Sequence, residues 1–182
     1  TIKSFNTWHL YINLLPNQMM SLGISSLPIV FVTGLFSGMV TSVQAAYQFE
    51  SGFIPTWYVG GIVGEAVLLE LGPMITALVM TGRVGATIAA EIGTMKVTEQ
   101  IDALKTLSTN PYNYLFIPRI LAGIVSLPFL VFVGDIIGVF GGYLICTEVL
   151  NFNPVVYLQN TYNFVQFLDV FSGLVKACVF GF

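Results

Sequence analysis

The sequence has 182 residues, of which 55% are hydrophobic and 8% are charged, and its mean hydropathy is +0.85. Soluble domains carry about 25% charged residues, so this composition excludes an ordinary soluble domain and a disordered chain. A formal net charge of −3 without any basic block excludes nucleic-acid binding. One histidine and two cysteines do not make a zinc site without carboxylates, so we expect no metal site. The remaining class is an integral membrane protein, and the continuous apolar runs indicate an all-α bundle.

The first predicted elements are a surface helix and a membrane span. Residues 7–18 place Trp8 and Tyr11 at helical spacing among apolar neighbours, which is typical of an amphipathic helix at the membrane interface. The alternative is that these residues are the irregular start of the span that follows. Residues 19–47 contain no charged side chain and are long enough to cross a bilayer, so they form the first predicted span.

Two further spans contain isolated charges, and a fourth is incomplete. Residues 57–90 and 115–146 form the second and third predicted spans, and residues 167–182 begin the fourth. Pro28 and Pro128 should kink the first and third spans. We therefore expect a fragment, truncated at its carboxyl end, with three complete spans. The charges within the second and third spans are Glu65, Glu70, Arg83, Arg119 and Asp135.

An amphipathic helix is predicted over residues 91–108, between the second and third spans. Val97, Ile101 and Leu104 share one face, and charged or amide side chains occupy much of the rest. The polar side is either solvated or available to a protein partner. Two lysines lie in this loop, whereas the other two connections contain neither Lys nor Arg. The positive-inside rule therefore places this loop and the amino terminus in the cytoplasm.

Small residues recur at four-residue spacing in the predicted spans, which lets helix backbones approach closely in lipid. We interpret most of them as packing within one subunit, with contact between subunits as the alternative. The sequence Ser26-Leu27-Pro28 and two following glycines recur 100 positions later, either as a parallel repeat or by coincidence. The packing glycines are Gly34, Gly38, Gly82, Gly85, Gly134, Gly138 and Gly142.

Two charged residues of the second span are candidates for binding lipid. Arg83, near the cytoplasmic end, could hold an anionic headgroup. The alternatives are a structural pair with a carboxylate, such as Glu91 on a similar helix face, and snorkelling to the interface. Glu70 precedes Gly72-Pro73, where the helix should be distorted and the freed backbone groups need partners.

The middle of the chain closely resembles the MlaE-type permease family, the membrane subunits of ABC transporters that work with MCE-domain lipid carriers. The resemblance extends from about residue 16 to the end, and it is most specific between Glu70 and Arg119. No phosphate-binding loop or hydrolase motif is present, so we expect no catalytic residue. The matching stretches are Leu69-Glu70-Leu71-Gly72-Pro73, Gly82-Arg83-Val84-Gly85-Ala86, the run from Ala90 to Leu104, Asn110-Pro111 and Pro118-Arg119.

This resemblance implies a single permease domain over residues 1–182, with five spans in a full-length chain that continues beyond residue 182. It implies a homodimer that pairs with two cytoplasmic ATPases and with an MCE-domain protein. The ATPases would bind ATP and Mg, and this chain would hold no cofactor. The implied cargo is phospholipid or a related lipid. The implied location is a bacterial inner membrane, or alternatively a plastid inner envelope.

The resemblance also implies that the segment from Glu91 to Leu107 is the coupling helix that docks on the ATPase. The family's lipid cavity lies between the two copies, and Arg83 and Glu70 are the candidates for lipid contact. The alternatives are an ion-coupled secondary transporter or channel using Glu65, Glu70 and Asp135, and a membrane scaffold without transport. The predicted ATPase-coupling residues are Glu91, Lys96, Glu99, Gln100, Asp102 and Lys105.

Overall fold

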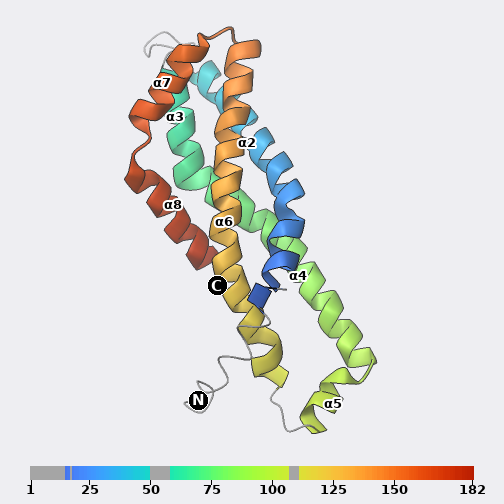
Figure 1. Ribbon diagram of the computed structural model, residues 1–182. Coiled ribbons are helices and arrows are strands. Elements are labelled where there is room, and N and C mark those ends of the chain that lie inside the picture. Colours follow the sequence, from blue (N-terminus) through green and yellow to red (C-terminus); the bar gives the residue numbers. More distant parts are fainter. Residues whose placement is uncertain (1–14, 17, 50–57, 107–110) are drawn as a thin grey trace.

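The computed structural model describes residues 15, 16, 18–49, 58–106 and 111–182, and every regular element within these ranges is a helix (Figure 1). Three helical segments are long and apolar enough to cross a membrane: Gln18–Phe49, Val59–Val97 and Leu115–Glu148. A fourth crossing is possible by the same test if α7 and α8 form one bent span. These helices confirm the predicted all-α membrane bundle.

The first span contains an irregular turn before its main helix. A 3₁₀ turn, η2 (Ile24–Ser26), leads into α2 (Leu27–Phe49). Pro28 lies in the first turn of α2, so the irregularity precedes it instead of kinking the middle of the span. Proline has no N–H for the carbonyl four residues earlier, which explains the tighter turn at this place. The surface helix predicted over residues 7–18 lies almost wholly outside the described residues and stays a prediction.

The second span changes helix type at its centre. It consists of α3 (Val59–Ala66), a π-helical turn η4 (Val67–Leu71) and α4 (Gly72–Val97). The N–H of Gly72 donates to the carbonyl of Val67, and Pro73 follows in the first turn of α4. The wide turn accommodates the proline ring without breaking the span. The distortion predicted at Gly72-Pro73 is confirmed.

The helix expected over residues 91–108 is divided differently in the structure. α4 continues through Val97, and a separate short helix, α5 (Gln100–Thr106), follows after a turn. Glu99 adopts a left-handed conformation with φ of 57°, which ends α4 and redirects the chain. Residues 91–97 therefore extend the second span as one rigid helix, and only α5 changes direction. The predicted end of the helix at residues 107–110 lies outside the described part.

The third span, α6 (Pro111–Glu148), is the central helix of the bundle (Figure 1). It continues as one helix through Pro118 and through Pro128, where a kink was predicted. Its contact with α2 is the most extensive between any two described helices. Gly34 lies against Gly134, and Gly38 against Gly138. Because both numbers rise together, α2 and α6 run parallel, and the equivalent glycines of the two similar stretches face each other.

The connection expected over residues 147–166 contains a helix that the sequence analysis did not predict. α7 (Pro154–Phe164) is followed after two residues by α8 (Phe167–Phe180), and the two helices are bent by 72°. The side chain of Asn153 accepts a hydrogen bond from the N–H of Val155 and caps α7. Gln159, Asn160 and Asn163 interrupt the apolar pattern, which is why this helix was missed.

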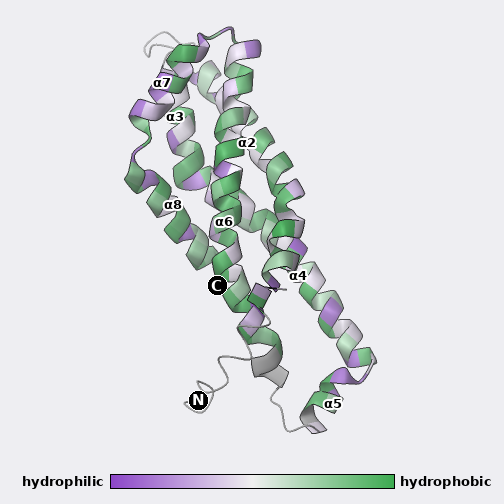
Figure 2. Cartoon of the chain, in the orientation of Figure 1, coloured by the Kyte–Doolittle hydropathy of each residue, from purple (hydrophilic) through white to green (hydrophobic). Residues whose placement is uncertain are grey.

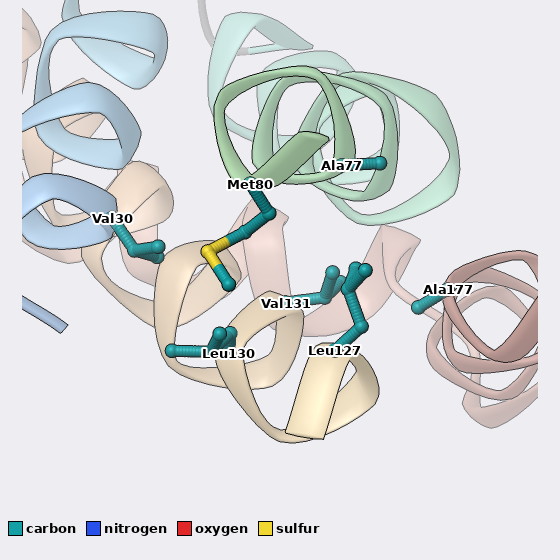
Figure 3. Packing of buried hydrophobic residues seen from close by; sticks show 7 residues of the cluster. All are labelled: Val30, Ala77, Met80, Leu127, Leu130, Val131 and Ala177. Atoms are coloured by element: carbon teal, nitrogen blue, oxygen red, sulfur yellow. The ribbon is translucent and has the colours of Figure 1, made fainter. Parts of the chain in front are cut away.

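Two apolar clusters hold the bundle together. The first joins α2, α4, α6 and α8, and Figure 3 shows Met80 of α4 between Val30 of α2 and Leu130 of α6. The second lies toward the end of the bundle that carries α7, and it includes Val63 and Tyr157. Apolar residues predominate along the bundle, whereas polar residues gather near α5 and at the opposite end (Figure 2). α5 and α7 thus lie at opposite ends of the bundle (Figure 1).

Candidate functional site

The end of the bundle that carries α5, here called the α5 end, exposes most of the predicted coupling residues. The end of α4 and the start of α6 both extend past the other helices toward α5 (Figure 1). Val97 is 84% exposed beside these polar side chains, so the surface has an apolar element as well. The side chain of Lys105 lies outside the described part. Of the residues predicted to contact an ATPase, the structure exposes Glu91, Lys96, Glu99, Gln100 and Asp102.

Glu91 connects α4 to α6 through an ion pair. Its carboxylate binds the guanidinium of Arg119, which is only 8% exposed, while Glu91 itself is 46% exposed. Arg119 also donates to the carbonyl of Leu115 at 3.4 Å, and its Nε has no partner among the described residues. A buried cation needs a counter-charge because leaving it alone is costly. The pair therefore ties the predicted coupling segment to the central helix α6.

Arg83 does not pair with Glu91, which was one of the alternatives considered for it. Its guanidinium donates to the backbone carbonyl of Ser25, at the 3₁₀ turn that precedes α2. The distorted turn leaves this carbonyl available, and a charged donor satisfies it. Arg83 is half-buried, so part of its side chain stays accessible. A role in lipid binding is not tested by this contact and remains a prediction.

Lys176 of α8, like Arg83, donates a hydrogen bond to a backbone carbonyl at an irregular turn, in this case the π-helical turn η4. Its Nζ donates to the carbonyl of Leu69 at 2.7 Å. Leu69 lies four residues before Pro73, whose missing N–H leaves that carbonyl without its usual helical partner. Glu70 lies in the same turn with its side chain exposed. The sequence analysis did not name Lys176, although the freed carbonyl already required a donor from another helix.

We expect Lys176→Met to destabilise the protein by about 1 kcal/mol or less, because it removes a charge-assisted hydrogen bond to a backbone carbonyl at an exposed site. Thermal unfolding of the purified full-length protein in detergent measures this change. Lys176→Arg retains a cationic donor and should recover most of the stability. An equal loss in both variants would contradict the assignment of the stabilisation to a cationic donor at this position.

The predicted packing glycines fall into two groups. The glycines of α2 and α6 meet inside the bundle, where an added Cβ at Gly142 would lie 2.6 Å from Oγ of Ser42. By contrast, a Cβ at Gly82 or Gly85 of α4 would meet no described atom within 4 Å. The first group therefore packs within one chain in this structure. A third row was missed: Gly60, Gly61 and Gly64 of α3, which face α7.

The fold and this site define an all-helical membrane protein with a polar helix at one end of its longest spans. The chain belongs to the MlaE family: residues 15–182 match the model of permease MlaE. It is 50% identical over 173 residues to a probable ABC transporter permease protein of Rickettsia typhi, covering 95% of this chain and 66% of that protein.

Two more distant relatives have names that describe their roles or location. The chain is 36% identical to the intermembrane phospholipid transport system permease protein MlaE of Haemophilus influenzae, covering 92% of this chain and 64% of that protein. It is 32% identical to the chloroplastic protein TRIGALACTOSYLDIACYLGLYCEROL 1 of Arabidopsis thaliana, with 90% and 47% coverage. The chain thus spans less than two thirds of the length of these relatives.

Proposed function

We propose that the full-length protein is the permease subunit of an ABC transporter that moves phospholipid or a related lipid between membranes. The observation that carries this proposal is the placement of α5. This helix and the residue before it expose acidic and amide side chains at one end of the two longest spans. Family membership and the names of the relatives support it. A separate subunit would bind ATP and Mg and hydrolyse the nucleotide.

The proposed coupling passes through rigid helices. α5 contacts both α4 and α6. The ion pair between Glu91 and Arg119 also joins α4 to α6, and Glu91 lies nine residues before the start of α5. A force applied to α5 would therefore move the second and third spans together, because packed helices transmit displacement as rigid bodies. Closure of the ATPase would supply that force.

The remaining parts of the proposal concern the assembly and its location. We infer a homodimer that works with an MCE-domain lipid carrier, in a bacterial inner membrane or alternatively a plastid inner envelope. The open surface of α4 at Gly82 and Gly85 is consistent with contact to another membrane helix. Arg83 and Glu70 remain the proposed lipid contacts, and the half-buried Arg83 would meet an anionic headgroup near the α5 end.

Charge reversal at the α5 end tests the ATPase contact. We expect the double variant Glu99→Lys and Asp102→Lys to lower the recovery of the ATPase with the purified full-length permease by tenfold or more, because like charges would replace complementary ones. The matched control is Glu148→Lys, an exposed acid at the opposite end of α6. Unchanged recovery with the double variant, while the protein remains folded, would contradict the assignment of α5.

Transport itself is tested by reconstitution with labelled phospholipid. The proposal requires transfer that depends on both ATP and the ATPase subunit. Transfer driven by an ion gradient without the ATPase would favour the ion-coupled alternative. If the complex moves no lipid under either condition, the protein is instead a scaffold.

A further inference from the structure

We propose that a groove between α6, α7 and α8 binds the ammonium headgroup of a membrane lipid at Asp135. This inference rests on the proposed lipid transport and specifies the class of lipid that the protein recognises. The groove differs from the predicted lipid contacts at Arg83 and Glu70, since neither residue lines it.

The groove is large and mostly apolar. Its volume is about 900 Å³, and α6, α7, α8 and the π-helical turn contribute to its walls. Such a lining suits acyl chains and the glycerol region of a lipid, which gain from burial against apolar side chains. Its apolar residues include Leu68, Phe132, Ile136, Val139, Leu158 and Val170.

Asp135 is the charged residue of this groove. It is 3% exposed, and its Oδ1 accepts no hydrogen bond from any described residue. This oxygen packs against Gly72, where an added Cβ would overlap it, and faces the distorted turn before Pro73, so a headgroup in the groove would reach the other carboxylate oxygen of Asp135. A carboxyl group at this depth is expensive to bury unless a partner donates to it.

The described residues that surround Asp135 supply no cation for this purpose. None of the residues lining the groove is Lys or Arg. Lys176, on the neighbouring helix, already donates to the carbonyl of Leu69. Asp169 accepts from the backbone N–H of Gln166 at the start of α8. An ammonium group would give Asp135 both an opposite charge and a hydrogen-bond donor, which a neutral or anionic headgroup would not.

The bend between α7 and α8 completes the site. Irregular backbone within a membrane is tolerated where it is buried in protein or lines a cavity, and broken helices often form substrate sites for this reason. Asn163 and Gln166 lie at the bend and line the groove, and their amide groups can donate to a phosphate. A zwitterionic aminophospholipid carries the matching ammonium and phosphate next to each other.

The first experiment compares lipid occupancy in the full-length permease with its ATPase, purified from bilayers of equal parts phosphatidylethanolamine, phosphatidylcholine and phosphatidylglycerol with identical acyl chains. We expect Asp135→Asn to lower the bound fraction of phosphatidylethanolamine about tenfold, since a charge-assisted hydrogen bond is lost. Occupancy by phosphatidylglycerol should not change. Phosphatidylcholine has the positive charge but no N–H, so weak binding of it in the wild type would identify hydrogen bonding as the cause. Glu148→Gln serves as the control acid.

A second variant keeps the proposal testable if Asp135→Asn does not fold. Leu158 lines the groove and is 54% exposed, so Leu158→Trp should obstruct the groove without disturbing the core. It should lower phosphatidylethanolamine occupancy, whereas Val40→Trp on the exposed face of α2 should not. No effect of Leu158→Trp would overturn the proposal and indicate that another part of the protein fills the groove.

Two further outcomes separate the sources of failure. Free ethanolamine, which has the amine without acyl chains, should not displace the lipid; displacement would indicate a site for small amines instead. If the wild-type complex moves lipid but binds all three headgroups equally with and without Asp135, this inference fails and the proposed function stands. If the wild-type complex moves no lipid, the proposed function fails first.

Discussion

Gly38→Leu is expected to destabilise the protein by more than about 3 kcal/mol, because the new side chain has no space between α2 and α6. An added Cβ at this position would overlap the backbone carbonyl of Gly138. A backbone atom cannot rotate away as a side chain can, so the two helices would have to separate. Their contact is the most extensive in the described bundle, and its loss should lower the midpoint of thermal unfolding and the yield of folded protein.

Gly82→Leu is the matched control for this prediction. Gly82 is also a glycine within a membrane helix, but an added Cβ there meets no described atom within 4 Å. Its effect on unfolding of the dissociated subunit in detergent should be small. Equal destabilisation by both substitutions would mean that helix conformation, and not close contact between α2 and α6, limits these positions.

The second large effect is expected for Glu91→Leu, which should cost about 2 kcal/mol because it leaves the buried Arg119 without its counter-charge. The cost is below that of a fully buried pair, since Glu91 is 46% exposed and partly solvated. We expect α4 to loosen from α6 and the yield of complex with the ATPase to fall along with stability.

The exchanged pair Glu91→Arg with Arg119→Glu distinguishes this structural role from a direct ATPase contact. If the ion pair is the main role, the exchange should restore part of the thermal stability lost in each single variant, and recovery of the ATPase should improve with it. If Glu91 binds the ATPase directly, the exchange should restore stability but not ATPase recovery. If the loss of stability in the double variant equals the sum of the losses in the two single variants, Glu91 and Arg119 do not stabilise each other.

The general architecture followed from the sequence because membrane spans depend on local composition. Residues 19–47, 57–90 and 115–146 are long apolar runs, and each corresponds to a helix capable of spanning a membrane. The distortion before Pro73 was likewise predictable, since proline lacks an N–H wherever it occurs. The family resemblance was confirmed for the same region.

Polar interruptions limited the prediction of α7. Its helix depends on the cap at Asn153 and on contacts with α3, including the hydrogen bond from Thr161 to the carbonyl of Gly60 at 3.0 Å. Those contacts join residues about a hundred positions apart. Hydropathy along the chain reports how apolar a segment is, but it does not report which helix covers its polar groups.

The sequence by itself therefore determined the class of protein, the approximate spans and the distortion before Pro73, because these properties arise within a few helical turns. The partners of the buried charges were decided only by tertiary structure. Arg119 pairs with Glu91, Arg83 binds the Ser25 carbonyl, and Asp135 lies against Gly72. Helical periodicity defines the face on which a side chain lies, whereas its partner depends on how separate helices pack in space.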